Sequence, residues 1–414
     1  MESQLSPDTP LLPLTQFQKS MIALGSVAMG AGMTINFVVV APLARQAGLT
    51  EIEVASILTL STLIYALMIP RWGRLANRYG RKRVMVFSLL AMAATNMAFL
   101  FALSAALAGA ITGMTMFFTL VFARFWFGLL SPGLQPASMA AMTDATTAKT
   151  RAGGLGMLGA AVSIGSIIGP AGAAALAPFG ALAPLWGSII FCAVCGTLIG
   201  FILPATRPVA RTSKRPPALR MFDPRVFPHL TFLFTYFVAI GMIQQTLGWF
   251  IQDRYEVSLG LTKEDVVLYT GIAFACLAIM MVIIQFGYIA PRKPDPRKIL
   301  PVGLILVAAG YIGADMVQPF WALCAAFLVI GAGAALAVPA ANALGSLSVK
   351  REEQASAAAL LAAAPPSGFI FGPLIGATLY GIAPSIPLLV AAGVMVILAV
   401  YAFTVTRHKP LNLN

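Results

Sequence analysis

The chain has 414 residues, of which 59% are hydrophobic and only 10% are charged, and its mean hydropathy is +0.87. A soluble globular protein carries about 25% charged residues, so this composition excludes that class and indicates a multi-pass membrane protein. The net charge of +13 does not indicate nucleic-acid binding, because the basic residues form short clusters between apolar runs instead of a stripe interleaved with aromatic residues.

Twelve apolar stretches have the length of about 20 residues that crossing a bilayer requires. They are predicted at residues 19–43, 52–71, 84–106, 114–142, 152–177, 182–204, 228–252, 265–290, 299–316, 319–346, 355–383 and 385–406. The polar segment before the first stretch has no basic region, so no cleaved signal peptide is expected. The sequence thus predicts an all-α membrane protein with 12 transmembrane helices.

The basic residues give the expected orientation of these helices. Of the 27 Lys and Arg residues, 23 lie on the side to which the twelve-span arrangement assigns both termini, and only Arg45, Arg254 and Lys263 lie on the other. Loops rich in Lys and Arg stay in the cytoplasm, so both termini are expected there, with the protein in the inner membrane. The densest group, six basic residues between Arg71 and Arg83, marks the loop after the second span.

The two halves of the chain repeat the same motifs. Gly128-x7-Pro136-Ala137 recurs as Gly331-x7-Pro339-Ala340, and Gly165-x3-Gly169-Pro170 recurs as Gly368-x3-Gly372-Pro373, each 203 residues later. The predicted organisation is an N-terminal six-helix half (1–204), a cytoplasmic linker rich in Pro and Arg (205–227) and a C-terminal six-helix half (228–414). Pseudo-symmetric halves are typical of secondary transporters, whose substrate site lies near the midplane at the interface between the repeats.

Three motifs carry a family resemblance. They are Gly73-x-Leu75-Ala76-x-Arg78-x-Gly80-Arg81-Lys82, Arg124-x3-Gly128 and Gly156-x8-Gly165-x3-Gly169-Pro170. On these motifs the chain resembles, over essentially its whole length, the twelve-span drug:proton antiporters of the major facilitator superfamily. The resemblance implies a transporter that works without a cofactor and is not an enzyme. The family usually has Asp at the position of Asn77, which weakens the charge relay proposed for this loop.

Two regions are expected to control conformational change. Basic side chains of the loop after span 2 can bind helix C-termini and carboxylates of neighbouring helices. The glycines of span 5 thin one helix face, and Pro170 permits a bend, so that span 5 is interpreted as a pliable seam between the two halves. Simple helix packing explains the glycines equally well. The predicted gating residues are Gly73, Asn77, Arg78, Gly80, Arg81, Asp144, Gly165, Gly169, Pro170, Gly372 and Pro373.

Arg124 is the only charge placed well inside a predicted span. A charge there costs about 2.5–3.5 kcal/mol on insertion scales, so a functional role such as anion binding is expected. The alternative is a structural role in which Arg124 binds carbonyls of span 1. The residues predicted to bind substrate with it are Thr34, Asn36, Gln135, Tyr236, Gln244, Gln245, Trp249 and Asn342, each of which can instead serve helix packing or hydrogen bonding.

No carboxylate lies in the middle of a predicted span. Because an arginine stays protonated, Arg124 alone cannot carry a proton cycle. The predicted proton carriers are therefore the acids at the outer span ends, namely Glu53, Asp253, Asp265 and Asp315. Thr50-x2-Glu53 and Thr262-x2-Asp265 also predict helix N-terminal caps. A fixed positive charge without a negative one should repel permanent cations.

These features predict a secondary active transporter that exports a small organic molecule in exchange for protons. An anionic or neutral amphipathic metabolite, such as a siderophore-like compound, and a hydrophobic drug remain open as substrates. The alternative is an importer, uniporter or exchanger of an organic anion held by Arg124. No metal site is expected, since His229 and His408 lie near span ends and the cysteines lack metal-ligand neighbours. The expected partners are the lipid bilayer, the substrate and protons, without nucleic acid, and the protein is expected to be a monomer.

Overall fold

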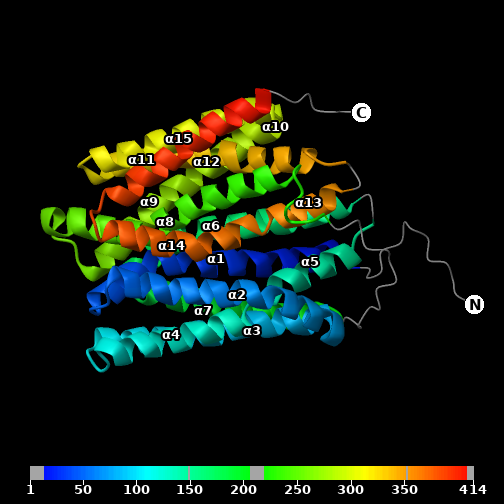
Figure 1. Cartoon of the computed structure of the whole chain (residues 1–414). Coiled ribbons are helices and arrows are strands. Elements are labelled where there is room, and N and C mark those ends of the chain that lie inside the picture. The colour runs from blue at the N-terminus through cyan, green and yellow to red at the C-terminus, as the bar shows by residue number, and fades with distance from the viewer. Residues whose placement is uncertain (1–13, 148–149, 206–218, 351–352, 408–414) are drawn as a thin grey trace, which may run out of the picture. The chain divides into compact units, whose positions relative to one another are not determined.

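The computed structural model describes residues 14–147, 150–205, 219–350 and 353–407, and within them the chain is a series of helices (Figure 1). The first part of the chain forms α1 (Gln16–Gln46), α2 (Glu51–Tyr79), α3 (Arg81–Leu107), α4 (Gly113–Leu130), α5 (Leu134–Asp144), α6 (Arg151–Leu176), the short turn η1 (Ala177–Phe179) and α7 (Ala183–Ile202). The second part forms α8 (Phe227–Leu259), α9 (Lys263–Ile284), η2 (Gln285–Ile289), α10 (Ala290–Arg292), α11 (Pro296–Met316), α12 (Phe320–Leu347), α13 (Gln354–Leu361), α14 (Ala364–Tyr380) and α15 (Ile386–Arg407).

Among the described residues, eleven helical segments are long and apolar enough to cross a membrane. They correspond to eleven of the predicted spans. The remaining prediction, one helix over 355–383, is wrong in detail, because this region divides into α13, with 8 residues, and α14, with 17. Pro365 and Pro366 explain the break: proline lacks the backbone N–H and disfavours helical geometry in the residue before it, so a helix starts there more readily than it continues.

The predicted span 114–142 is interrupted in the same way. Helix α4 ends at Leu130 and α5 starts at Leu134, with Pro132 and Gly133 between them. Helix α9 is not interrupted but widens into the π-helical turn η2 before α10. The hydropathy of the chain therefore predicts where it crosses the membrane, while prolines decide where the helices break.

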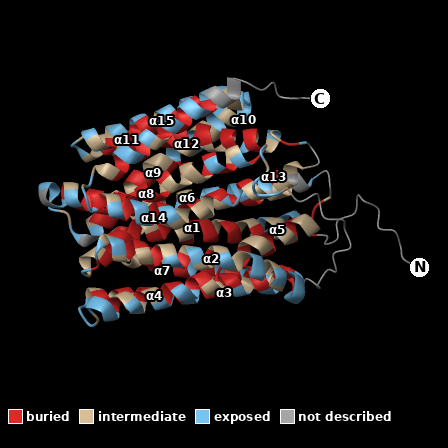
Figure 2. Ribbon diagram, in the orientation of Figure 1, coloured by how far each residue is buried: buried red, intermediate tan, exposed pale blue. Residues whose placement is uncertain are grey.

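The chain divides into two compact units. One comprises Met1–Arg211 with Lys263–Leu268, and the other comprises Thr212–Thr262 with Tyr269–Asn414. In each unit the long helices bury some of their residues and leave large apolar residues on other faces exposed. Figure 2 shows buried and exposed positions along the same helices in both units. Such exposed apolar faces are expected where a helix meets lipid.

The two units use equivalent helix pairs. In the first, α1 packs along α6 and α7, and α3 packs along α7; in the second, α8 packs along α14 and α15, and α11 packs along α15. The repeated glycines lie where α6 contacts α1 in the first unit and where α14 contacts α8 in the second. A side chain at Gly169 would overlap Thr34 and Ala31 of α1, and one at Gly372 would overlap Val238 and Gly241 of α8. The 203-residue sequence repeat is thus also a repeat of backbone contacts.

Candidate functional site

The first part of the site is the close approach of α4 to α2. Arg124 and Gly128 are one turn apart on α4, so they share a helix face. A Cβ atom at Gly128 would lie only 2.6 Å from the carbonyl oxygen of Ser61 on α2. The Ser61 hydroxyl in turn donates to the carbonyl oxygen of Arg124 at 3.0 Å. The glycine of the Arg124-x3-Gly128 motif therefore lets α2 hold the α4 backbone at the position of the arginine.

The Arg124 guanidinium is buried within the first unit, with only 2% of the residue exposed. Its Nη2 donates to Asn36 Oδ1 on α1 at 2.5 Å, and its Nη1 donates to Asn96 Oδ1 on α3 at 3.3 Å. The Asn36 amide is oriented by its own donation to the Gly32 carbonyl oxygen at 2.6 Å. Arg124 thus joins α1, α3 and α4 through two neutral amide oxygens.

Two aromatic rings complete the surroundings of this guanidinium. Its central carbon lies 3.8 Å from the ring centroid of Phe99 and 5.5 Å from that of Phe127. Cation–π attraction of this kind is worth about 2 kcal/mol when the charge is removed from water. The rings stabilise the charge of Arg124 but do not neutralise it.

The charge of Arg124 has no acidic partner among the described residues. None of their carboxylates forms an ion pair with it, and its Nε is buried without a hydrogen-bond acceptor. A guanidinium has five N–H donors, and a carboxylate or phosphate is the acceptor that fits its planar fork. The arrangement can therefore attract an anion and offer it a directed donor.

The structure brings together only some of the predicted substrate-binding residues. Asn36 contacts Arg124, whereas the Thr34 hydroxyl donates to backbone carbonyls of its own helix at Gly30 and Ala31. The exposed Asn342 likewise donates to Val338 of its own helix. Gln135 is half-buried on α5, and the side chains of Tyr236, Gln244, Gln245 and Trp249 belong to α8 in the second unit.

Several predicted residues on α8 have unpaired polar atoms: the Tyr236 hydroxyl, Gln244 Oε1 and both polar atoms of the Gln245 side chain. Gln245 has two of them. It is fully buried, and neither its Oε1 nor its Nε2 has a hydrogen-bond partner. Leaving a buried polar group unpaired costs about 1–3 kcal/mol. An amide with both an unused donor and an unused acceptor suits a ligand group that has both, such as a carboxamide or a neutral carboxylic acid.

At the end of the first unit where α2 meets α3, Arg81 makes both kinds of contact expected for the loop after span 2. Its Nη1 donates to the Ala76 carbonyl oxygen near the C-terminus of α2 at 3.2 Å, and its Nε lies 3.2 Å from Asp144 Oδ2 at the end of α5. The second contact is an ion pair without hydrogen-bond geometry. Gly80 precedes it with a φ of 94°, in the left-handed region that favours glycine, and so allows α3 to start directly after α2.

Other members of this loop motif lie further from the ion pair. Gly73 faces Pro136 of α5, to which an added Cβ would come within 3.6 Å, and Asn77 is exposed. The Arg78 guanidinium is exposed and lies 5.5 Å from the ring centroid of Tyr79. The contacts between helices at this end are therefore concentrated on Arg81 and Asp144.

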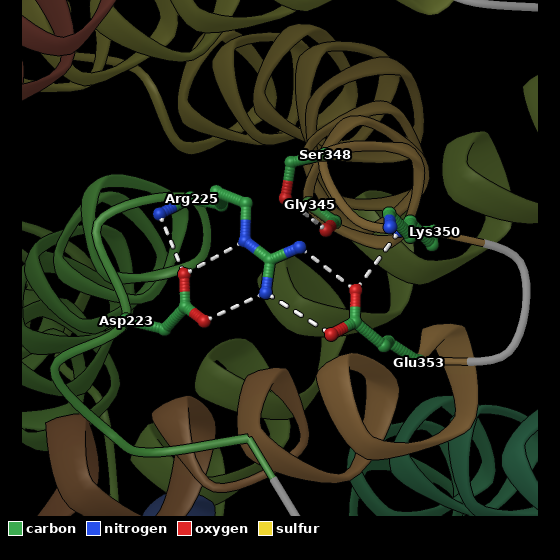
Figure 3. Close-up of polar contacts among 6 residues, drawn as sticks. All are labelled: Asp223, Arg225, Gly345, Ser348, Lys350 and Glu353. Carbon is green, nitrogen blue, oxygen red and sulfur yellow. Dashed lines mark hydrogen bonds and ion pairs between the residues drawn. The ribbon is translucent and has the colours of Figure 1, made fainter. Parts of the chain in front are cut away.

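The second unit has a different ionic contact at α8 and α13, which we call the Arg225 clamp and which comprises Asp223, Arg225 and Glu353 (Figure 3). Arg225 donates to both oxygens of Asp223 at 3.0 and 2.9 Å and to both oxygens of Glu353 at 2.8 and 3.1 Å. Arg225 holds the pKa of Asp223 down to about 2 and also lowers the pKa of Glu353, because its hydrogen bonds favour both ionised carboxylates. The clamp joins the start of α8 to the turn before α13 and stays charged at neutral pH.

The predicted proton carriers have distinct environments. Glu53 Oε2 accepts from the Thr50 backbone N–H and hydroxyl, both at 2.8 Å, which confirms the predicted N-terminal cap of α2. Asp253 Oδ2 accepts from the Tyr380 hydroxyl of α14 at 2.7 Å. Asp315 has a buried Oδ1 without a hydrogen-bond partner, while its backbone oxygen accepts from Arg254. Asp265 lies in the first turn of α9.

Sequence reasoning missed Asn96 and the Arg225 clamp. Asn96 is the only amide side chain in the predicted span 84–106, which was the one signal that the sequence offered. Its position on the face of α3 that meets α4 comes from the structure. Arg225 and Glu353 lie 128 residues apart, and no spacing rule connects them. Contacts of this kind come from the tertiary arrangement alone.

Comparison with known proteins agrees with this architecture. The model of the Major Facilitator Superfamily matches residues 22–313 and 292–414. Multidrug resistance protein 2 of Bacillus subtilis (strain 168) is 25% identical over 340 residues, covering 79% of this chain and 80% of the relative. The class H tetracycline resistance protein of Pasteurella multocida is 24% identical over 343 residues, covering 78% of each chain.

Solved structures show the same fold. A bacterial homologue of the human lysosomal transporter Spinster, in an inward-facing and occupied conformation, has a TM-score of 0.70 and 14% identity, over 95% of this chain and 97% of that one. The human organic anion transporter MFSD10 (TETRAN) has a TM-score of 0.63 and 17% identity, over 94% and 100%. The chain is thus a multi-pass membrane transporter and not an enzyme. It belongs to the major facilitator superfamily.

Proposed function

We propose that the protein exports small anionic or neutral amphipathic compounds in exchange for protons, by alternating access, with Arg124 as the contact for the substrate anion. The observation that supports this most strongly is the buried guanidinium of Arg124, which has no acidic partner among the described residues and keeps an unused Nε–H. A residue that only joined α1, α3 and α4 would not need a net charge. The names of the relatives, multidrug and tetracycline resistance proteins, favour export over import.

The proposed proton carrier is Asp253. Glu53 is already used as a helix cap, whereas the Asp253 carboxylate is bound by Tyr380 on another helix. A charged carboxylate accepts a hydrogen bond about twice as strong as a neutral one does. Protonation of Asp253 would therefore weaken the contact between α8 and α14 and so couple the proton to helix movement. In this proposal the protein is a monomer in the inner membrane with both termini in the cytoplasm.

The experiment is transport by inverted vesicles under an imposed pH gradient, with a carboxylate-bearing compound and ethidium as the two substrates. Arg124→Gln should lower transport of the carboxylate at least tenfold, because the loss of one charge-assisted hydrogen bond is worth about 1.5–3 kcal/mol. Arg124→Lys should retain part of the transport, since charge remains but the forked donor is lost. Lys19→Gln, which removes a charge far from the site in sequence, is the matched control.

Two outcomes would contradict the proposal. Full carboxylate transport by Arg124→Gln would show that this charge only supports the fold, and robust ethidium transport by the wild type would contradict the exclusion of permanent cations. The alternative of an importer or exchanger of an organic anion rests on the same unpaired charge. It is distinguished by direction, because an importer would accumulate the carboxylate in right-side-out vesicles and not in inverted ones.

A further inference from the structure

Four cations lie close together where α10 leads into α11: Arg292, Lys293, Arg297 and Lys298, which we call the α10–α11 cluster. Arg297 is half-buried and the other three are exposed. None of them forms an ion pair with any residue in the described part of the chain. The helix α10 lies at the end of the second unit that also carries α13 (Figure 1).

The single acid within the cluster is already in use. Asp295 is the N-cap of α11, and its side chain accepts from the backbone N–H of Arg297 at 3.0 Å. Arg297 and Lys298 then occupy the first turn of α11, where the positive end of the helix dipole disfavours cations. Two cations at this position become favourable when an external anion lies beside them. An anionic partner would therefore stabilise the two cations in the first turn of α11.

The backbone of the cluster is also unusual. Lys293 has a φ of 45°, the only positive φ outside glycine among the described residues. This left-handed residue ends α10 and turns the chain towards α11, which places both pairs of cations at one bend. Arg292 donates to the Gly287 carbonyl oxygen at 3.1 Å and lies 5.4 Å from the ring centroid of Tyr288. Strained positions of this kind concentrate at ligand sites.

Apolar helix faces lead to the cluster from both sides. On α9 and η2 the exposed side chains are Ile279, Val282, Ile283 and Phe286, spaced along one helix face. On α11 they are Val302, Ile305, Ile312 and Met316. Tyr288, between the α9 face and the cations, has the amphipathic character of residues at the membrane–water interface. A molecule with an anionic head and long apolar chains could contact both the cations and the apolar helix faces next to them.

We propose that the α10–α11 cluster binds the phosphate headgroup of an anionic lipid, whose acyl chains lie along the exposed face of α9 or α11. Clusters of Lys and Arg directly after a membrane-spanning helix attract anionic lipids. A soluble phosphate would use the cations but would gain nothing from the apolar faces that end at them. This inference concerns a surface that takes no part in the proposed transport site and does not depend on it.

The experiment is native mass spectrometry of the full-length protein in detergent, titrated with phosphatidylglycerol or phosphatidylcholine. The double variant Arg297→Gln with Lys298→Gln should bind phosphatidylglycerol roughly 25-fold more weakly, since each cation near a membrane surface contributes about fivefold, and should bind phosphatidylcholine as the wild type does. The matched control is Arg71→Gln with Arg74→Gln, which removes two exposed cations from the C-terminal part of α2 in the first unit. It should leave the affinity for phosphatidylglycerol unchanged.

A second pair of substitutions, Arg292→Gln with Lys293→Gln, should weaken binding similarly and so covers the case in which the first variant is poorly folded. Equal loss in the control and in the α10–α11 variants would overturn the proposal, because general attraction of the lipid to exposed basic residues would then suffice. Release of phosphatidylglycerol by millimolar inorganic phosphate would assign the cluster to a soluble anion and would also overturn it. Retention of the lipid in phosphate, together with loss in both α10–α11 variants, is the expected result.

Discussion

Replacing Gly165 by alanine tests the contact on which the first unit is built. A Cβ atom at Gly165 would overlap the Val27 carbonyl oxygen and lie 2.9 Å from the Ala31 nitrogen, both in the backbone of α1. An overlapping side chain could move away by adopting another rotamer, but the backbone of a packed helix cannot move without shifting the helix. The variant therefore forces α1 and α6 apart along a contact that runs for much of their length.

The expected magnitude follows from two opposing terms. Overpacking a close contact costs about 1–3 kcal/mol, while alanine in a helix is about 1 kcal/mol more favourable than glycine. The difference of the two terms is a net loss of up to about 2 kcal/mol in the free energy of unfolding of Gly165→Ala. Gly156 lies on the same helix with no atom within 4 Å of an added Cβ, so Gly156→Ala should raise it by up to about 1 kcal/mol.

The assay is thermal unfolding of both variants in the same detergent, followed by their initial rates of transport. The two substitutions are chemically identical and lie in one helix, so their difference isolates the contact with α1. Gly372→Ala should behave like Gly165→Ala, because its Cβ would lie 2.6 Å from the Val238 carbonyl oxygen of α8. Equal stability of Gly165→Ala and Gly156→Ala would refute the reasoning.

Two further predictions concern the ion pairs at the helix ends. Asp144→Asn should lower the free energy of unfolding by about 3 kcal/mol, because it leaves the buried charge of Arg81 unpaired; adding Arg81→Gln should restore part of the loss, and a double-mutant cycle in detergent measures this. In the Arg225 clamp, folding lowers the pKa values of Asp223 and Glu353. The clamp therefore stabilises the folded state above pH values of about 4, the pKa of these carboxyl groups in the unfolded chain, and this stability is lost as the pH falls through their pKa values in the folded state. Thermal unfolding between pH 7 and pH 3 should therefore show a smaller acid-induced loss for Glu353→Gln than for the wild type, and an unchanged acid profile would contradict the role of the clamp.

The sequence predicted most of the fold because the formation of each membrane-spanning helix depends on residues close together in the chain. Apolar stretches of about 20 residues must cross a bilayer as helices, since no other single segment satisfies its backbone hydrogen bonds there. The repeated glycines predicted two equivalent halves, and Gly169 with α1 and Gly372 with α8 make equivalent contacts within the two units. Their proposed role in gating remains a prediction, because the contacts that the structure gives to Gly165 and Gly169 lie within the first unit.

The contacts of the site could not be predicted in the same way. Arg124 was identified by the free energy that a charged side chain costs inside a membrane, which is a property of one residue. Its partners depend on how three helices pack. Of those partners, Asn36 was among many polar candidates and Asn96 was not considered. Hydropathy also cannot separate one long helix from the pair α13 and α14, because the alanines around the break are equally apolar on both sides.

Arg81, Arg124 and Arg225 each join helices in the described part of the chain, and they differ in what they bind. Arg81 and Arg225 are both paired with carboxylates. For the buried Arg81 this pairing offsets the cost of removing its charge from water. Arg124 is the most deeply buried of the three and has only the amide oxygens of Asn36 and Asn96. If its purpose were to hold helices together, a carboxylate in place of either asparagine would do so at lower cost. Amides keep the guanidinium oriented without neutralising it, which leaves its charge available to a ligand.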